Sequence, residues 1–400
     1  MSDISKKTFI WAIIGLILLR VVFLVLLFNN IPFTDMQPNW RPNFGGSYWP
    51  DEVVFFNLAK SLADFKPIVS IIYIGYAIFL APFIYFTSAT SPEMISKIIV
   101  IFQGIILFAA ALIFIAFIGK KFFKNKKLAL ISATLFLVYP YLMFAIWKLI
   151  GHKNAIPTFH YQMWIVILSD YLSAFLVILT FWLFIKLLEQ FEKTNSGIYY
   201  LTIATGIFAG AAALVRPPNL AIAAFLFFYL LYIKKRKLAL ILGLSSFIAY
   251  LPQLIYNTYF FSWPWVYGNV VLGSGLPQGG PFFGHWVNPA NFWINFRHFS
   301  PNHYFLLFLV TAAFVISIFI LGWKYLVKTN NKFIAVFVFW FLFYVLFYGQ
   351  FRGSASQFRY FLPAIPVFIY FFVAAMLYLY KCIKGRQSQW FLPLIVKKIP

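Results

Sequence analysis

The few acidic residues of this chain are unevenly distributed. Of nine Asp and Glu residues, five fall between the first apolar run and the next clear one. They are Asp35, Asp51, Glu52, Asp64 and Glu93. At the centre of this stretch, Trp49-Pro50 precedes the adjacent carboxylates Asp51 and Glu52. Carboxylates beside a membrane surface can serve as a general base or as metal ligands. We therefore predict that this stretch carries the active site.

Another carboxylate, Asp170, interrupts an almost wholly apolar run from Met163 to Phe184. The run predicts a helix that places Asp170 about two turns inside the external surface, where a carboxylate costs roughly 2.5 to 3.5 kcal/mol. Its small neighbours Ser169, Ser173 and Ala174 allow close packing, which would turn the carboxylate into the bundle. Asp170 is therefore either a second catalytic or metal-positioning group or a hydrogen-bonded structural acid.

Cations at the predicted external membrane edges could bind a phosphate group. An Arg–phosphate pair contributes roughly 1.5 to 3 kcal/mol through charge-assisted hydrogen bonds. We rank Arg359 and Arg216 first and Lys66 next, although each could instead extend to lipid head groups. Arg20 lies within the first apolar run, where a structural role is expected. The full set of external candidates is Lys66, Arg216, Arg297, Arg352 and Arg359.

The composition indicates a membrane protein with many spans. The chain is 63% hydrophobic, 22% aromatic and only 10% charged, and its mean hydropathy is +0.85. The formal charge of +23 does not indicate nucleic-acid binding, because the basic residues form short clusters between apolar runs. The abundance of Phe, Ile, Lys and Asn favours an AT-rich genome, and hence the plasma membrane of a bacterium or archaeon.

Apolar runs predict about ten membrane-spanning helices. The first, residues 8–28, should remain as an anchor, since it is too long for a secretory signal and lacks a small-residue cleavage site. The others lie near residues 97–118, 128–147, 163–185, 198–214, 218–233, 238–257, 304–323, 333–349 and 360–380. We therefore predict an all-α polytopic fold, with residues 1–400 forming one transmembrane catalytic domain without a soluble domain.

The positions of Lys and Arg predict that both termini are cytoplasmic. With that orientation, most of the basic residues fall on the cytoplasmic side, including the cluster from Lys120 to Lys127. This assignment requires that residues 68–86 do not cross the membrane. The segment is apolar but contains Gly75 and Pro82. We predict a re-entrant or interfacial helix within a first external loop of residues 29–96.

Several short motifs occur in an order that resembles a known family. The run from Trp49 to Ala59 is similar to the first-loop Asp-Glu motif of the GT-C class of membrane glycosyltransferases, the group of protein O-mannosyltransferases and lipid A aminoarabinose transferases. Further similar elements are Lys66-Pro67 through Tyr73 and Pro82, Ser169-Asp170-Tyr171-Leu172, Gly206 to Leu214 followed by Val215-Arg216-Pro217, and Arg359-Tyr360-Phe361-Leu362-Pro363. The resemblance covers residues 10–380.

The resemblance implies transfer of a sugar from a polyprenyl-phosphate donor to a lipid, glycan or protein acceptor on the outer face, with inversion. Asp51 would be the base that takes the acceptor's proton, an effect worth about 10² to 10⁴ in rate. Asp170 and Glu52 would orient the acceptor or a divalent cation such as Mg²⁺ or Mn²⁺, with Asp51 and Asp170 as candidate metal ligands. Adjacent helical residues diverge by about 100°, so Asp51 and Glu52 should not face the substrate together. Tyr360 and the external cations would bind the sugar and the lipid phosphate.

The chain departs from the aminoarabinose enzymes, because Val54 and Phe55 stand where a basic residue follows their Asp-Glu pair. A long external loop, residues 258–303, is rich in aromatic residues and glycine and could close over a lipid-linked sugar. Alternative functions are a transporter or flippase for a lipid-linked or anionic solute, and a polysaccharide polymerase or ligase. A transporter should carry ionisable groups or broken helices near the centres of several spans.

Overall fold

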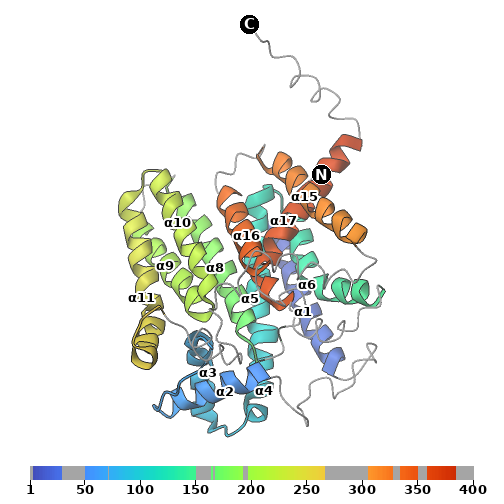
Figure 1. Cartoon of the computed structure of the whole chain (residues 1–400). Coiled ribbons are helices and arrows are strands. Elements are labelled where there is room, and N and C mark those ends of the chain that lie inside the picture. The colour runs from blue at the N-terminus through green and yellow to red at the C-terminus, as the bar shows by residue number, and fades with distance from the viewer. Residues whose placement is uncertain are drawn as a thin grey trace.

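The computed structural model is a bundle of helices, and no strand occurs in the part of the chain it describes (Figure 1). It describes residues 3–28, 50–70, 72–149, 164, 167–191, 197–265, 305–327, 334–349 and 358–383. The predicted all-α fold is confirmed for these residues. The loop of residues 258–303 lies mostly outside them.

Among the residues that the structure describes, seven helices are long and apolar enough to cross a membrane. The prediction of about ten spans stays a prediction for the remaining three, which coincide with shorter apolar helices or helix segments. The long helices are α1 (Lys6–Phe28), α4 to α5 (Pro92–Ile101, Phe108–Phe123) joined by the π-helix η2 (Phe102–Leu107), α6 (Lys126–Leu149), α8 (Ser169–Gln190), α9 (Ile198–Val215), α11 (Arg236–Phe261), and α17 (Ile365–Ile383) with the 3₁₀-helix η5 (Phe358–Ala364) before it. The other three are α10 (Leu220–Tyr232), α15 (Phe305–Val327) and α16 (Ile334–Gly349).

Two groups of helices meet at the centre of the bundle. On one side, α9 packs between α8 and α11, and α10 packs against α11 and α16. On the other, α5 packs against α6, and α17 packs against α15 and α6. Helix α8 joins the groups through its contacts with α5 and η5, and its apolar side chains are buried almost throughout. This central position explains how a polar residue on α8 can avoid lipid.

Helices α2 (Pro50–Ala63) and α3 (Ile74–Thr87) lie across one end of the bundle (Figure 1). Helix α3 has 14 residues, so it is about 21 Å long and too short for a hydrocarbon core of about 30 Å. The exposed side chains of Tyr85 and Phe86 near its C-terminal end suit a membrane interface. These observations support the prediction that residues 68–86 do not form a span.

Contacts at the opposite end of the bundle test the same point. The Asp3 carboxylate accepts a hydrogen bond from the backbone N–H of Lys126 and pairs with the Lys126 ammonium at 3.1 Å. The backbone hydrogen bond is the main cause of the lowered pKa of Asp3. Lys121 pairs with Glu189 at the end of α8. The N-terminus and the basic α5–α6 turn therefore share one end of the bundle, which an additional crossing before α5 would forbid.

The two ends can be assigned to membrane faces by labelling cysteines. In sealed cells, we expect a membrane-impermeant maleimide to label Phe65→Cys in a Cys382→Ser background, because Phe65 lies at the α2–α3 end and is 85% exposed. The native Cys382, near the end of α17, should react only after the membrane is permeabilised. Labelling of both positions from the same side would contradict this topology.

Helices α9 and α11 approach closely because α9 carries glycine at two positions that face α11. A Cβ added at Gly210 would collide with the backbone oxygen of Ser246, and one at Gly206 with Ser245. Small residues at such positions let helix backbones meet in membranes. The contact also fixes the C-terminal half of α9, which ends directly before Arg216.

We expect Gly210→Ala to destabilise the protein by about 1 to 3 kcal/mol, because the added methyl group must separate the two helices. The measurement is thermal unfolding in detergent. Gly15→Ala is the matched control, since nothing lies within 4 Å of a Cβ added at Gly15 on α1. Equal melting temperatures for the two variants would show that the α9–α11 contact is loose.

Candidate functional site

A buried ion pair between Asp170 and Arg216 is the centre of the candidate site. Arg216 Nη2 lies 2.7 Å from Asp170 Oδ1, and the two side chains are 11% and 1% exposed. The other carboxylate oxygen, Oδ2, has no hydrogen-bond donor among the described residues. The pair joins the first turn of α8 to the end of α9.

The sequence places Arg216 by ending α9 directly before it. Arg216 has extended backbone angles of φ −147° and ψ 107°, as expected for a residue that precedes proline. Pro217 and Pro218 then form the short 3₁₀-helix η3 (Pro217–Asn219), from which α10 leaves. The guanidinium is thus projected from a sharp bend between two helices rather than from a continuous helix.

Asp170 lies in the first turn of α8, not two turns inside a longer span. The helix begins at Ser169 because Leu168 is extended, with φ −136° and ψ 144°. The expectation of a helix from residue 163 was therefore wrong at this end. A carboxylate in the first helical turn is favoured by the helix dipole. The free-energy cost of burying Asp170 is therefore lower in this turn than it would be two turns inside a span.

Two tyrosines and a serine complete the surroundings of the guanidinium. Arg216 Nε donates to Ser169 Oγ at 3.3 Å, and Nη1 donates to Tyr348 Oη at 3.2 Å. The Arg216 Cζ lies 4.7 Å from the centre of the Tyr360 ring, which stacks on the ring of Tyr348. The Arg216 guanidinium, at the end of α9, is therefore contacted by residues of α8, α16 and the 3₁₀-helix η5.

A second set of polar contacts lies beside the ion pair and is centred on Asn219. The Asn219 amide donates to Ser173 Oγ at 2.8 Å and to the carbonyl of Ala212 at 3.0 Å. Ser173 lies one turn after Asp170 on α8, so the contact fixes η3 against the same helix. Asn219 and Ser173 are fully buried. This layer holds Arg216 and Asp170 at a defined separation.

Glu52 connects the first loop to this site. Its side chain is 2% exposed, and Oε1 accepts a hydrogen bond from the backbone N–H of Ile167 at 2.9 Å. Ile167 precedes Asp170 by three residues, so the start of α2 is anchored beside the start of α8. This contact gives Glu52 a positioning role. The expectation that Glu52 and Asp51 do not face a substrate together stays a prediction, because the Asp51 side chain is not described.

The other predicted site residues fall into three groups. Asp51 lies in the first turn of α2 and Arg359 in η5, but their side chains are not described. Arg297 and Arg352 fall outside the described residues. Lys66 is exposed beyond the end of α2 farthest from Glu52, and no described contact brings it to Arg216. Of the predicted cations, the structure places Arg216 at the site.

Some contributing residues were not predicted from the sequence. Ser169 and Ser173 were interpreted only as small packing residues, and Tyr348 and Asn219 were not singled out. Tyr348 lies near the end of a wholly apolar helix, where a tyrosine usually indicates the membrane interface. Only the fold shows that its hydroxyl meets Arg216.

The described side chains do not form a cluster of three or more metal-binding groups. The Asp170 Oδ2 is buried and has no hydrogen-bond donor among the described residues, and the Asp51 side chain, the other predicted ligand, is not described. A divalent cation would therefore need Asp51 together with substrate or water oxygens, which is the mixed coordination that Mg²⁺ commonly adopts.

Arg20 occupies a separate buried site on α1. It is 1% exposed, its Nε donates to the Gly104 carbonyl at 3.0 Å, and its Cζ lies 4.0 Å from the centre of the Phe108 ring. Gly104 belongs to the π-helix η2, a geometry that is often found at functional positions. These contacts fit the structural role expected for Arg20.

Comparisons of this chain with protein-family models, with curated proteins and with solved structures find no match.

Proposed function

We propose that this protein is a membrane glycosyltransferase that transfers a sugar from a polyprenyl-phosphate donor to an acceptor outside the bilayer, with inversion. The observation that supports this function best is the buried Asp170–Arg216 pair at the same end of the bundle as Glu52 and the start of α2. The guanidinium is placed to bind the leaving phosphate. The start of α2 carries Asp51, the proposed base that removes the acceptor's proton.

Arg216 suits the leaving phosphate. Three of its nitrogens contact Asp170, Ser169 and Tyr348, yet a guanidinium carries five N–H donors, so two remain for phosphate oxygens. The surrounding contacts hold the guanidinium in place before the ligand arrives, which reduces the entropy lost on binding. Asp170 balances the charge of the guanidinium and holds it from the side opposite the phosphate.

The proposed reaction balances without a redox partner. An acceptor oxygen attacks the anomeric carbon, and the bond from that carbon to the phosphate oxygen breaks as the new glycosidic bond forms. The polyprenyl phosphate leaves with the bonding electron pair, and Arg216 offsets its charge. Asp51 takes the acceptor's proton, and a single displacement inverts the anomeric configuration.

The proposal can be tested with radiolabelled polyprenyl-phosphate sugars that differ in their sugar. Vesicles containing the purified protein are incubated with each donor and with membrane extract as the acceptor source. We expect label from at least one donor to appear in a new glycosylated product. Label that only crosses the bilayer would identify a transporter, and label that neither moves nor changes with any donor would overturn the proposal.

The transporter alternative is favoured by one specific feature. Arg20 is an ionisable group inside a span, and its Nε contacts the irregular helix η2, which matches the combination expected for a translocation path. Its guanidinium is, however, 1% exposed and packed on Phe108. A transported solute would have to displace that ring, whereas the Arg216 side chain is 11% exposed.

A further inference from the structure

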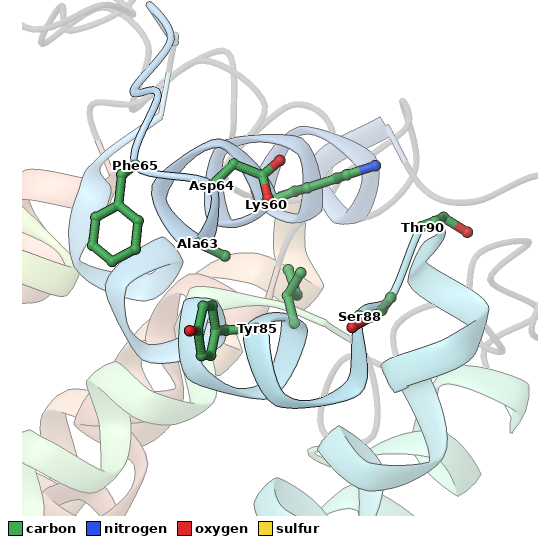
Figure 2. Close-up of a pocket in the computed structure, with 9 residues that line it drawn as sticks. Lys60, Ala63, Asp64, Phe65, Tyr85, Ser88 and Thr90 are labelled. Atoms are coloured by element: carbon green, nitrogen blue, oxygen red, sulfur yellow. The ribbon is translucent and has the colours of Figure 1, made fainter.

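A pocket of about 420 Å³ lies between α2 and α3, at the end of α2 away from Glu52. Lys60 lines it from α2 and Asp64 from the turn that follows, and Tyr85, Ser88 and Thr90 line it from α3 and the turn after that helix (Figure 2). The volume is in the range of small-ligand sites. The pocket shares no lining residue with the Asp170–Arg216 site.

A positive and a negative side chain line the pocket without forming an ion pair among the described contacts. Lys60 and Asp64 are one helical turn apart, but no ion pair between them is present among the described contacts. A Lys that precedes an acid by four residues has the weaker of the two orientations for pairing on a helix. Figure 2 shows the Lys60 ammonium extending towards Ser88 and Thr90, while Asp64 lies nearer Phe65. The two charges therefore occupy different parts of the pocket.

Each part favours a different chemical group. On the Lys60 side, the ammonium and the Ser88 hydroxyl can donate hydrogen bonds to phosphate oxygens, and Thr90, whose hydroxyl donates to Met94 Sδ at 3.5 Å, lines the same side. On the Asp64 side, a carboxylate, an aromatic ring from Tyr85 and the nearby C-terminus of α2 all favour a cation. A ligand that matches both sides carries a phosphate and an ammonium group separated by a short linker.

The rim of the pocket indicates where such a ligand comes from. Phe65 is 85% exposed and has a left-handed backbone with φ 55°, and Phe86 beyond the pocket is 84% exposed. Ile68 and Val69 are also exposed. Large apolar side chains in this position meet acyl chains at a bilayer interface.

We propose that this pocket binds the head group of an ethanolamine phospholipid from the surrounding bilayer. The phosphate lies against Lys60, Ser88 and Thr90, the primary ammonium lies against Asp64 and Tyr85, and the acyl chains leave past Phe65. Bound there, the lipid braces the C-terminal end of the helix whose first turn contains Asp51. The proposal does not depend on the function assigned to the Asp170–Arg216 site.

The test measures which lipids the protein retains. Protein is reconstituted in bilayers with equal amounts of phosphatidylethanolamine, phosphatidylglycerol and phosphatidylcholine, extracted in mild detergent, and analysed by mass spectrometry of the bound lipids. We expect about fivefold enrichment of the ethanolamine lipid over each of the others, as a partly exposed charge pair contributes about 1 kcal/mol. Phosphatidylcholine should bind less because its ammonium carries no N–H donor.

Charge variants distinguish this proposal from non-specific association. Asp64→Asn should lose the preference for ethanolamine and retain phosphatidylglycerol at least equally, because only the phosphate contact remains. Lys60→Gln should lose retention of both lipids. Lys97→Gln, at an exposed lysine on α4, is the matched control and should behave as wild type. Melting temperatures of all variants in detergent report whether each variant is folded.

The proposal is overturned if wild type shows no preference among the three lipids, or if folded Asp64→Asn keeps the ethanolamine preference. It is also overturned if Lys60→Gln and Asp64→Asn leave lipid retention unchanged but weaken binding of a soluble sugar. That result would identify the pocket as a carbohydrate site.

Discussion

Asp51→Asn is expected to lower the rate of sugar transfer by about 10² to 10⁴, the usual contribution of a positioned general base. The amide has nearly the same shape as the carboxylate but cannot take the acceptor's proton. Asp51 lies in the first turn of α2, next to Glu52, whose contact with Ile167 anchors the helix beside Asp170. Because neighbouring contacts are retained, we expect donor binding and the melting temperature to stay close to wild type.

The measurement is the initial rate of product formation at saturating donor, with protein levels matched. Asp3→Asn is the control, because Asp3 is an acid at the opposite end of the bundle, where it pairs with Lys126. Equal transfer by wild type and Asp51→Asn would leave a glycosyltransferase possible but would remove Asp51 as its base. Loss of transfer accompanied by loss of donor binding would indicate a binding role instead.

Arg216→Gln is expected to destabilise the protein by about 3 to 5 kcal/mol, because it leaves the buried Asp170 carboxylate without its counter-ion. The Asp170 side chain is 1% exposed, so water cannot replace the guanidinium. The contacts with Ser169, Tyr348 and Tyr360 weaken at the same time. Transfer should also fall, since the phosphate loses its proposed cation.

A double-mutant cycle separates these effects. Adding Asp170→Asn to Arg216→Gln removes the uncompensated charge, so the double variant should be more stable than Arg216→Gln alone. Transfer should remain low, because the guanidinium is still absent. Arg236→Gln, at an exposed arginine that begins α11, is the matched control and should change neither property. Additive losses of stability in the cycle would show that the Asp170–Arg216 pair contributes little.

The expectations from sequence that the structure confirms depend on local patterns. Long apolar runs predicted the major helices, since a span must satisfy its backbone internally and present apolar side chains to lipid. The positions of Lys120 to Lys127 led to the expectation that residues 68–86 do not cross; this stays a prediction, which the Asp3–Lys126 contact supports. The span predicted near residues 198–214 coincides with α9, which ends at Val215.

The sequence by itself determined that the chain is a helical membrane protein and that Asp170 and Arg216 were unusual, because charged groups are costly in apolar helices. Only the tertiary structure decided that these two residues pair, that Glu52 turns inward to Ile167, and that Tyr348 and Tyr360 surround the guanidinium. These contacts join helices far apart in sequence. Their partners depend on how α8, α9, α16 and η5 meet in space, which local periodicity does not specify.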